Sequence, residues 1–82
     1  MNLIGSTVNL LRKNKKLTQE DLVARCNLLG WNISRGTLAK IESKCRCISD
    51  AEVYLLAQAL QVSVDHLYDT VTIEMALRQD SP

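Results

Sequence analysis

The sequence predicts a small, all-α domain, and three observations support this fold class. The chain has 82 residues, enough for one modest hydrophobic core. Its three glycines and one proline are too few for the many tight turns of a small β-sandwich or barrel. Apolar residues recur at helical spacing after polar residues that suit helix N-termini. We therefore expect short helices around an aliphatic core, because the chain has no Phe.

The first predicted helix carries Ile4, Val8 and Leu11 at helical spacing. Its C-terminal end is strongly basic, which suits the negative end of a helix dipole. The basic residues there are Arg12, Lys13, Lys15 and Lys16.

The second predicted helix begins at Thr18, a good N-cap residue. Asp21 stands three residues later and resembles the second half of a capping box, although Glu or Gln is more usual there. Gly30 is the expected residue just after the helix, because glycine readily adopts the left-handed conformation needed there. The apolar stripe of this helix comprises Leu22, Val23, Cys26 and Leu29.

The third predicted helix follows Ser34, another N-cap residue. Leu38 and Ile41 lie on one face and form a thin apolar side. The other faces carry the polar and basic residues Arg35, Thr37, Lys40 and Lys44. Such a helix docks on a core by one edge and leaves the other edge for a partner.

Two more helices complete the predicted domain. Ser49 begins the fourth, which we expect at the centre of the core because its apolar stripe is the richest: Val53, Leu56, Ala57 and Leu60. Ser63 caps a short fifth helix. Residues 69–82 combine strand-like alternation with helix-favouring residues, so their structure stays open. We take residues 1–68 as the domain and 69–82 as a short C-terminal tail.

Charge is distributed unevenly along the chain. Residues 1–48 hold nine Lys/Arg and three Asp/Glu, a net charge of +6, whereas residues 49–82 hold one Arg and six Asp/Glu, a net charge of −5. A basic half suits a polyanion such as nucleic acid. The plainer interpretation is that these charges cover solvated faces, which is common in small domains.

The pair of helices from Thr18 to Lys44 carries the functional signal. An α-helix fits the major groove of DNA, and its first turns reach base edges. Arg35 can donate two parallel hydrogen bonds to a guanine, and Lys40 can reach a base or a phosphate. Phosphate contacts are expected from Thr18, Gln19, Thr37, Lys44 and Arg46.

Several sequence blocks also stand in an order typical of one family. They are Leu-Thr-Gln-Glu-Asp-Leu at 17–22, Ile-Ser-Arg-Gly-Thr-Leu-Ala-Lys-Ile-Glu at 33–42, Ile-Ser-Asp at 48–50 and Leu-Leu-Ala-Gln-Ala-Leu-Gln-Val-Ser-Val-Asp at 55–65. In this combination the chain resembles the phage-repressor (Cro/XRE-type) helix-turn-helix family over roughly residues 4–68.

The resemblance implies a five-helix, lambda-repressor-like helix-turn-helix domain with residues 34–44 as recognition helix. It implies that Gln19 touches phosphate and that Ser34 and Thr37 meet the DNA backbone or a base. It also implies an ion pair that joins the first helix to the recognition helix, between Arg12 and Glu42. The base-reading residues that it implies are Arg35, Gly36 and Lys40.

The chain departs from the family in several places: Gly36, for example, has no side chain, so this reading position can contribute only backbone or close contact. The link from Val23 to Ser34 is longer than in the shortest members, so we expect an extra turn on the second helix and a wider connection at residues 30–32. After the recognition helix, Lys44 and Cys47 stand where the family often has Gly and Pro. The loop there is expected to follow an unusual path.

Other residues that could carry chemistry have plainer explanations. Cys45 and Cys47 could form half of a metal site or a redox switch, but a zinc site normally needs four ligands, so we interpret them as ordinary thiols. Trp31 could stack on a base, although a lone Trp more often covers a core edge. His66 has no evident nucleophile beside it. We therefore expect a protein without enzymatic activity, metal or cofactor.

The expected partner is double-stranded DNA, bound by a homodimer because one such domain grips only a half-site. We interpret the tail, with its apolar Val71, Ile73, Met75 and Leu77, as the dimer contact. The chain shows no signal-peptide pattern and no stretch approaching ~20 apolar residues, so we expect a cytoplasmic protein without membrane contact. The alternative function is a protein-interaction module, such as the antitoxin of a toxin–antitoxin pair with a protein partner.

Overall fold

A computed structural model of the chain describes residues 2–69, 71 and 76–77. Within these residues it contains five α-helices and no strand, which confirms the all-α prediction. The helices are α1 (Gly5–Asn14), α2 (Gln19–Leu28), α3 (Arg35–Glu42), α4 (Asp50–Leu60) and α5 (Val64–Tyr68).

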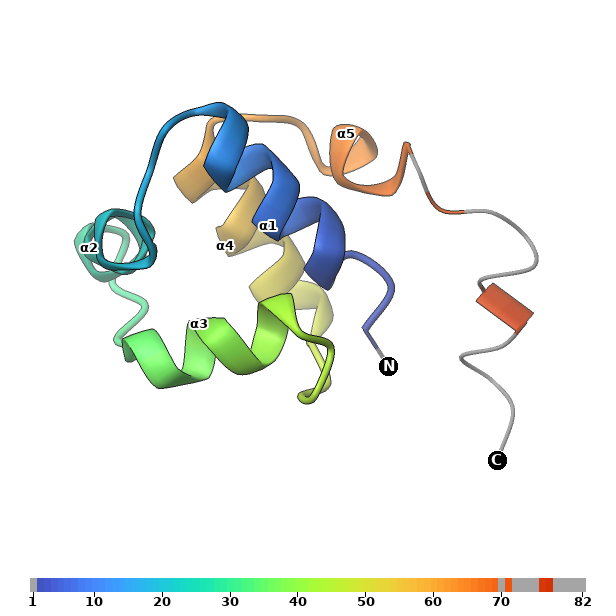
Figure 1. The fold of residues 1–82 in the computed structure, drawn as a ribbon, viewed down its shortest axis with the longest axis horizontal. Coiled ribbons are helices and arrows are strands. Elements are labelled where there is room, and N and C mark those ends of the chain that lie inside the picture. The colour runs from blue at the N-terminus through green and yellow to red at the C-terminus, as the bar shows by residue number, and fades with distance from the viewer. Residues whose placement is uncertain (1, 70, 72–75, 78–82) are drawn as a thin grey trace.

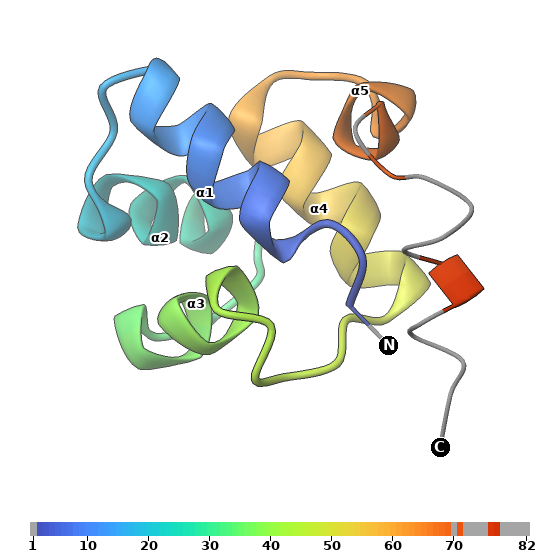
Figure 2. The ribbon, with the colours of Figure 1, turned by 45° about the vertical axis from the view of Figure 1, so that its right-hand side comes forward.

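The helices α1 and α4 cross the middle of the domain, with α3 at one edge and α5 at the opposite edge (Figures 1 and 2). Helix α1 contacts α3, α4 and α5, whereas α2 contacts α3 and α4. The α3 helix is therefore held from the side by α1 and α2, and it lies at the rim of the domain.

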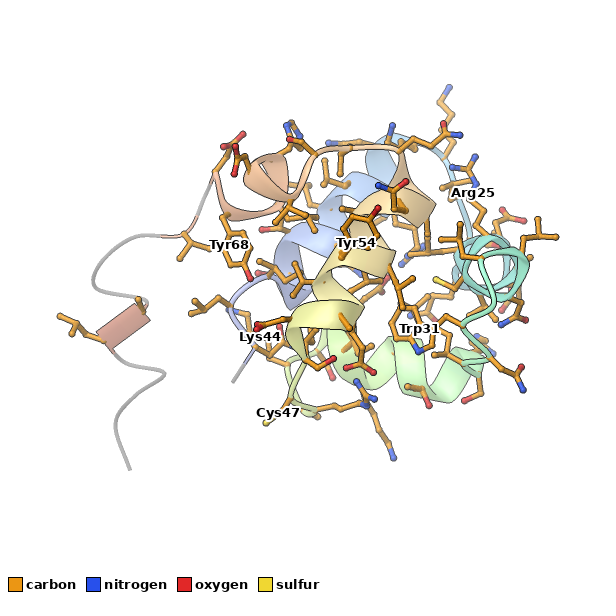
Figure 3. All side chains as sticks on the ribbon, turned by 180° about the vertical axis from the view of Figure 1, so that it is seen from behind. Arg25, Trp31, Lys44, Cys47, Tyr54 and Tyr68 are labelled. Atoms are coloured by element: carbon orange, nitrogen blue, oxygen red, sulfur yellow. The ribbon has the colours of Figure 1, made fainter. Side chains whose placement is uncertain are left out.

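The core is aliphatic, as the composition predicts, and α4 contributes the most buried side chains. Trp31 is half-buried and packs against this core from the α2–α3 connection, on the same face of the domain as Tyr54 (Figure 3). The prediction for Leu29 was wrong: it follows the last residue of α2 and is 46% exposed. The largest fully buried side chains are Ile4, Val8, Leu22, Cys26, Leu38, Ile41, Leu56, Leu60 and Leu67.

The helix starts match the predicted N-caps. The side chains of Thr18, Ser34, Ser49 and Ser63 each accept a hydrogen bond from the backbone N–H three residues later. Thr18 completes a capping box with Asp21, even though Asp is unusual in that place. Each cap satisfies a backbone donor that the helix itself leaves unpaired, so short polar residues set where the helices begin.

The helix ends depend on left-handed residues, most of which are not glycine. Gly30 follows α2 with φ +95°, as predicted. Lys16, Lys44 and Gln61 stand just after α1, α3 and α4, with φ of 58°, 65° and 60°. After α3, the N–H of Lys44 donates to the carbonyl of Ile41 at 3.1 Å. Lys44 thus adopts the turn conformation that a glycine would adopt more easily.

The N-terminal segment ties α1 to the end of α3. The side-chain amide of Asn2 donates to the carbonyl oxygens of Ile41 at 2.8 Å and Arg46 at 3.0 Å, and its oxygen accepts from the N–H of Gly5 at 2.8 Å. A Cβ atom on Gly5 would overlap the carbonyl of Ile41, so only glycine lets the two backbones approach this closely. Neither Asn2 nor Gly5 was predicted to have this role from the local sequence.

Candidate nucleic-acid interface

The α3 helix is amphipathic in the way that the sequence predicted. Leu38 and Ile41 are fully buried, so this side anchors the helix to the core. On the other side, Arg35, Gly36 and Lys40 are exposed. The three residues implied as base readers therefore lie on the accessible side of a helix at the rim of the domain.

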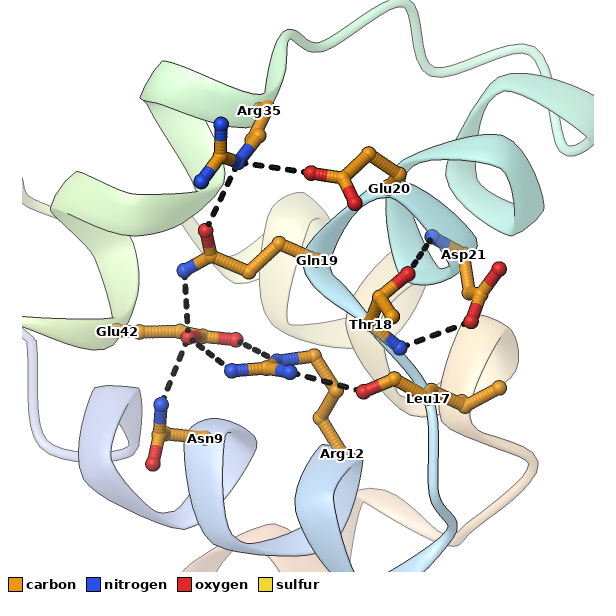
Figure 4. A network of polar contacts seen from close by, with 9 residues as sticks. All are labelled: Asn9, Arg12, Leu17, Thr18, Gln19, Glu20, Asp21, Arg35 and Glu42. Atoms are coloured by element: carbon orange, nitrogen blue, oxygen red, sulfur yellow. Dashed lines mark hydrogen bonds and ion pairs between the residues drawn. The ribbon is translucent and has the colours of Figure 1, made fainter.

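A buried ion pair fixes α3 to α1. The Nε and Nη2 atoms of Arg12 lie 2.7 Å and 3.1 Å from the two carboxylate oxygens of Glu42, and Nη1 donates to the carbonyl of Leu17 at 2.8 Å (Figure 4). Both residues are buried, with 7% of Arg12 and 8% of Glu42 accessible. The pair that the family resemblance implied is present, and it has a structural role.

Glu42 is the centre of a wider network. Its Oε1 atom also accepts from the side-chain amides of Asn9 at 2.8 Å and Gln19 at 3.1 Å, so α1 and α2 both hold the last residue of α3. Burial by itself raises the pKa of Glu42, but the hydrogen bonds from Arg12, Asn9 and Gln19 and the Arg12 charge outweigh it and lower that pKa below 4.5. Glu42 is therefore ionised at neutral pH, and it orients the residues around it.

The network continues from Gln19 to the exposed side of α3. The Gln19 side chain donates to Glu42 through Nε2 and accepts from Nε of Arg35 through Oε1, at 3.3 Å. Nε of Arg35 also lies 2.9 Å from Oε1 of Glu20. The structure thus brings Gln19 and Arg35 together.

The hydroxyl groups at the predicted site are used within the protein. Thr18 accepts from the N–H of Asp21 at 3.0 Å, and Ser34 accepts from the N–H of Thr37 at 3.2 Å. The Ser34 and Thr37 hydroxyl oxygens also lie 3.1 Å apart. The Thr18 hydroxyl and the Ser34–Thr37 pair stand at helix N-termini, where backbone N–H groups and the dipole favour anions.

The remaining predicted phosphate ligands differ in their surroundings. Lys44 is exposed in the turn after α3, next to the loop that carries Cys47 (Figure 3). Arg46 instead donates to both carboxylate oxygens of Glu52, at 3.0 Å and 2.8 Å, and to the carbonyl of Cys47. The guanidinium of Arg46 therefore has internal partners, and a phosphate would have to compete with Glu52 for it.

Sequence reasoning missed Asn9 and the contact between Glu20 and Arg35. Asn9 lies on a helix between apolar positions and gave no signal of its own. A carboxylate in the first turn of a helix is already explained by the helix dipole, so Glu20 gave no signal of a further contact. Its position beside the first residue of α3 depends on how the two helices cross, which the local sequence does not report.

The other candidate residues show no assembled site. Cys45 and Cys47 are exposed, whereas Cys26 is buried and its burial raises the pKa of its thiol to about 11. In the part of the chain that the structure describes, no three His, Cys, Asp or Glu residues are grouped as metal ligands would be. His66 is exposed beside Asp69, at 3.5 Å. None of the described helices is long and apolar enough to span a membrane.

Comparison with protein families matches residues 8–67 to the helix-turn-helix family. The matched range runs from α1 into α5 and includes both helices of the α2–α3 pair. Comparisons with curated proteins and with solved structures gave no match. The family match therefore supports the resemblance drawn from the sequence blocks.

Proposed function

The chain belongs to the helix-turn-helix family of the Cro/XRE type, and from this premise we propose that it is a sequence-specific, double-stranded DNA-binding transcriptional regulator. In this proposal residues 34–44 enter the major groove as the recognition helix. Arg35, Gly36 and Lys40 read bases, while Gln19, Ser34 and Lys44 are among the residues that meet the DNA backbone.

One observation carries the proposal most directly: α3 is anchored by one side and accessible on the other. Leu38, Ile41 and Glu42 fix the helix to α1 and α2, so its orientation is rigid. Arg35 and Lys40 are exposed on the free side, and Arg35 contacts the polar side chains of Gln19 and Glu20. A rigid helix with basic residues and a glycine on its outer side suits close approach to base edges.

The same proposal includes a repressor that works as a cytoplasmic homodimer. Two domains related by symmetry would bind a palindromic site one helical turn apart, because a single recognition helix covers only a half-site. The contact proposed for the tail lies mostly outside the described residues; of its apolar members, Val71 packs against the core and Leu77 is exposed. A chain that ends at residue 69 should keep its fold and lose self-association in sedimentation velocity.

The test is a selection from random DNA duplexes followed by fluorescence anisotropy over a salt series. We expect the wild-type chain to enrich a preferred sequence and to bind it with an affinity that falls steeply with salt. The Arg35→Ala/Lys40→Ala variant should lose about tenfold or more for the preferred sequence, because base contacts are removed.

A Lys13→Ala/Lys15→Ala variant is the matched control, because it removes the same charge from the end of α1. It should weaken binding to all duplexes alike and leave the sequence preference unchanged. Absence of binding by the wild-type chain at low salt would overturn the proposal and favour the protein-interaction module instead.

A further inference from the structure

The ion pair between Arg35 and Glu20 points to a role for Glu20 in DNA recognition. Resting on the DNA-binding function proposed above, we propose that Glu20 is a specificity-determining residue: by holding Nε of Arg35, it leaves the Nη edge of that guanidinium to read a guanine. Glu20 is a positioning residue in this scheme, and Arg35 makes the base contact.

The geometry of the guanidinium supports this assignment. The contacts of Arg35 with Glu20 at 2.9 Å and Gln19 at 3.3 Å are both made by Nε. Within the described part of the chain, no hydrogen bond involves either Nη atom of Arg35. Figure 4 shows this Nη end turned away from Glu20.

The consequence is a choice between two ways of binding guanine. An unrestrained arginine can present either its Nε–Nη edge or its Nη1–Nη2 edge to the two acceptors of guanine, since its five donors form a planar fork. With Nε occupied on the protein side, the Nη1–Nη2 edge remains, and it makes the two parallel hydrogen bonds that specify guanine. Fewer orientations of Arg35 mean a smaller entropy loss on binding and a sharper preference.

The position of Glu20 within the fold makes the restraint effective. Glu42 and Arg12 form a buried pair, Gln19 is hydrogen-bonded to that pair, and Arg35 contacts Gln19 and Glu20 together. The first residue of α3 is therefore held by two consecutive residues of α2.

The charge of Glu20 has a second effect on binding. The side chains of Arg35 and Glu20 are 68% and 64% exposed, so this carboxylate faces the same solvent as the arginine. Near DNA it repels phosphates and neutralises part of the Arg35 charge. Both effects weaken sequence-independent binding, which depends on neutralised phosphates. Glu20 thus lowers the affinity for wrong sequences while it orients Arg35 for the right one.

Two substitutions separate the contact from the charge. Glu20→Ala removes both, whereas Glu20→Asp keeps the charge at the helix start but shortens the side chain so that it no longer reaches Arg35. We expect both variants to lose about tenfold in discrimination between the selected duplex and one with its guanine replaced. Only Glu20→Ala should gain affinity for random duplexes, with a steeper dependence on salt. Asp65→Asn on α5 is the charge control and should change neither quantity.

A readout without DNA follows the contact directly. In the NMR spectrum of the free protein, the Arg35 Nε–Hε signal, assigned with Arg35→Lys, should shift in both Glu20 variants and stay in place in Asp65→Asn. If Glu20→Asp discriminates as well as the wild type, or if the signal does not move, the inference is overturned while the DNA-binding proposal stands. If the wild-type chain binds no duplex, the proposal and this inference fail together.

Discussion

Nε of Arg12 lies 2.7 Å from Oε2 of Glu42, and the two side chains are only 9% and 3% exposed. The pair connects α1 to the last residue of α3, and through Gln19 it is linked to α2. In this setting both charges have lost most of their hydration, which their mutual contacts have to replace. Among the described residues, every buried side-chain nitrogen and oxygen has a hydrogen-bond partner.

Breaking this pair from one side should be costly. Arg12→Met leaves the Glu42 carboxylate buried without its cation, and we expect it to lower the free energy of unfolding by about 3–5 kcal/mol. The Arg12→Met/Glu42→Leu double variant should be more stable than Arg12→Met, although Asn9 and Gln19 then lose their acceptor. Urea denaturation of the three proteins measures both differences. A double variant no more stable than the single one would show that the uncompensated charge is not the cause.

The ionised state of Glu42 also predicts how stability depends on pH. Its folded pKa is lower than the ordinary value of 4.5, so the unfolded chain binds the proton first as pH falls. The stabilisation from Glu42 is therefore complete above about pH 4.5 and is lost as the pH drops through the folded pKa. The pKa of Glu52 is also lowered, mainly by its hydrogen bond from Arg46. Glu52 therefore also stabilises the fold at neutral pH and loses this effect as the pH falls.

A Glu42→Gln variant tests this assignment, because it cannot titrate. It should be less stable than the wild type at neutral pH, and its stability should fall less steeply as the pH drops below 4.5. Thermal unfolding at several pH values gives the two curves. Parallel curves for the two proteins would mean that other carboxylates produce the whole acid transition.

Two helical glycines should respond to alanine in opposite directions. Gly5→Ala places a Cβ against the carbonyl of Ile41, and we expect it to destabilise the fold by about 1–3 kcal/mol, as overpacking does. Gly36→Ala meets only the Ser34 hydroxyl at 3.8 Å, so the better helix propensity of alanine should stabilise by up to ~1 kcal/mol. Urea denaturation of both variants measures this contrast, and a stabilised Gly5→Ala chain would be incompatible with the close approach of α1 and α3.

The three cysteines should separate into two reactivity classes. Cys45 and Cys47 are exposed and should react quickly with a thiol reagent in the native protein, whereas Cys26 is buried and its pKa is raised to about 11. Cys26 should react only as fast as the protein opens, and denaturant should bring its rate to that of the others. Rapid reaction of all three thiols under native conditions would contradict the packing of Cys26 in the core.

Part of this structure could be predicted from local sequence, and the rest depends on how helices meet. Thr18, Ser49 and Ser63 predict helix starts, because an N-cap bonds to a backbone N–H only three residues later. The burial of Leu38 could be predicted from the helical spacing of the apolar residues. By contrast, the pairing of Glu20 with Arg35 links two helices, and no periodicity within either helix reveals it.

Two further contacts had no local signal. Gly5 is required by the backbone of Ile41, which is far away in the sequence. Arg46 was predicted to be a phosphate ligand because its guanidinium is positively charged, yet the loop places it against Glu52. The sequence blocks supplied one long-range contact, the Arg12–Glu42 pair, only because the family resemblance implied it.

The turn after α3 connects stability with the proposed function. Lys44 adopts φ 65° and Gln61 adopts φ 60°; each stands just after a helix and lies in the left-handed region, where a side chain is strained. Glycine relieves this strain, although it also makes the unfolded chain more flexible. We therefore expect Lys44→Gly and Gln61→Gly each to raise the free energy of unfolding, by up to ~1 kcal/mol.

The two substitutions should differ in DNA binding. Lys44→Gly removes a proposed phosphate contact, so it should weaken binding to every duplex and reduce the salt dependence by about one counterion. Gln61 caps the C-terminal end of α4, which lies away from α3 (Figure 1), so Gln61→Gly should leave the affinity for DNA and its salt dependence unchanged. Chemical denaturation and anisotropy on the same samples separate the effects. If Lys44→Gly is stabilised and binds DNA like the wild type, Lys44 acts only in the turn, and the phosphate contacts must be sought among the other basic residues of the first half of the chain.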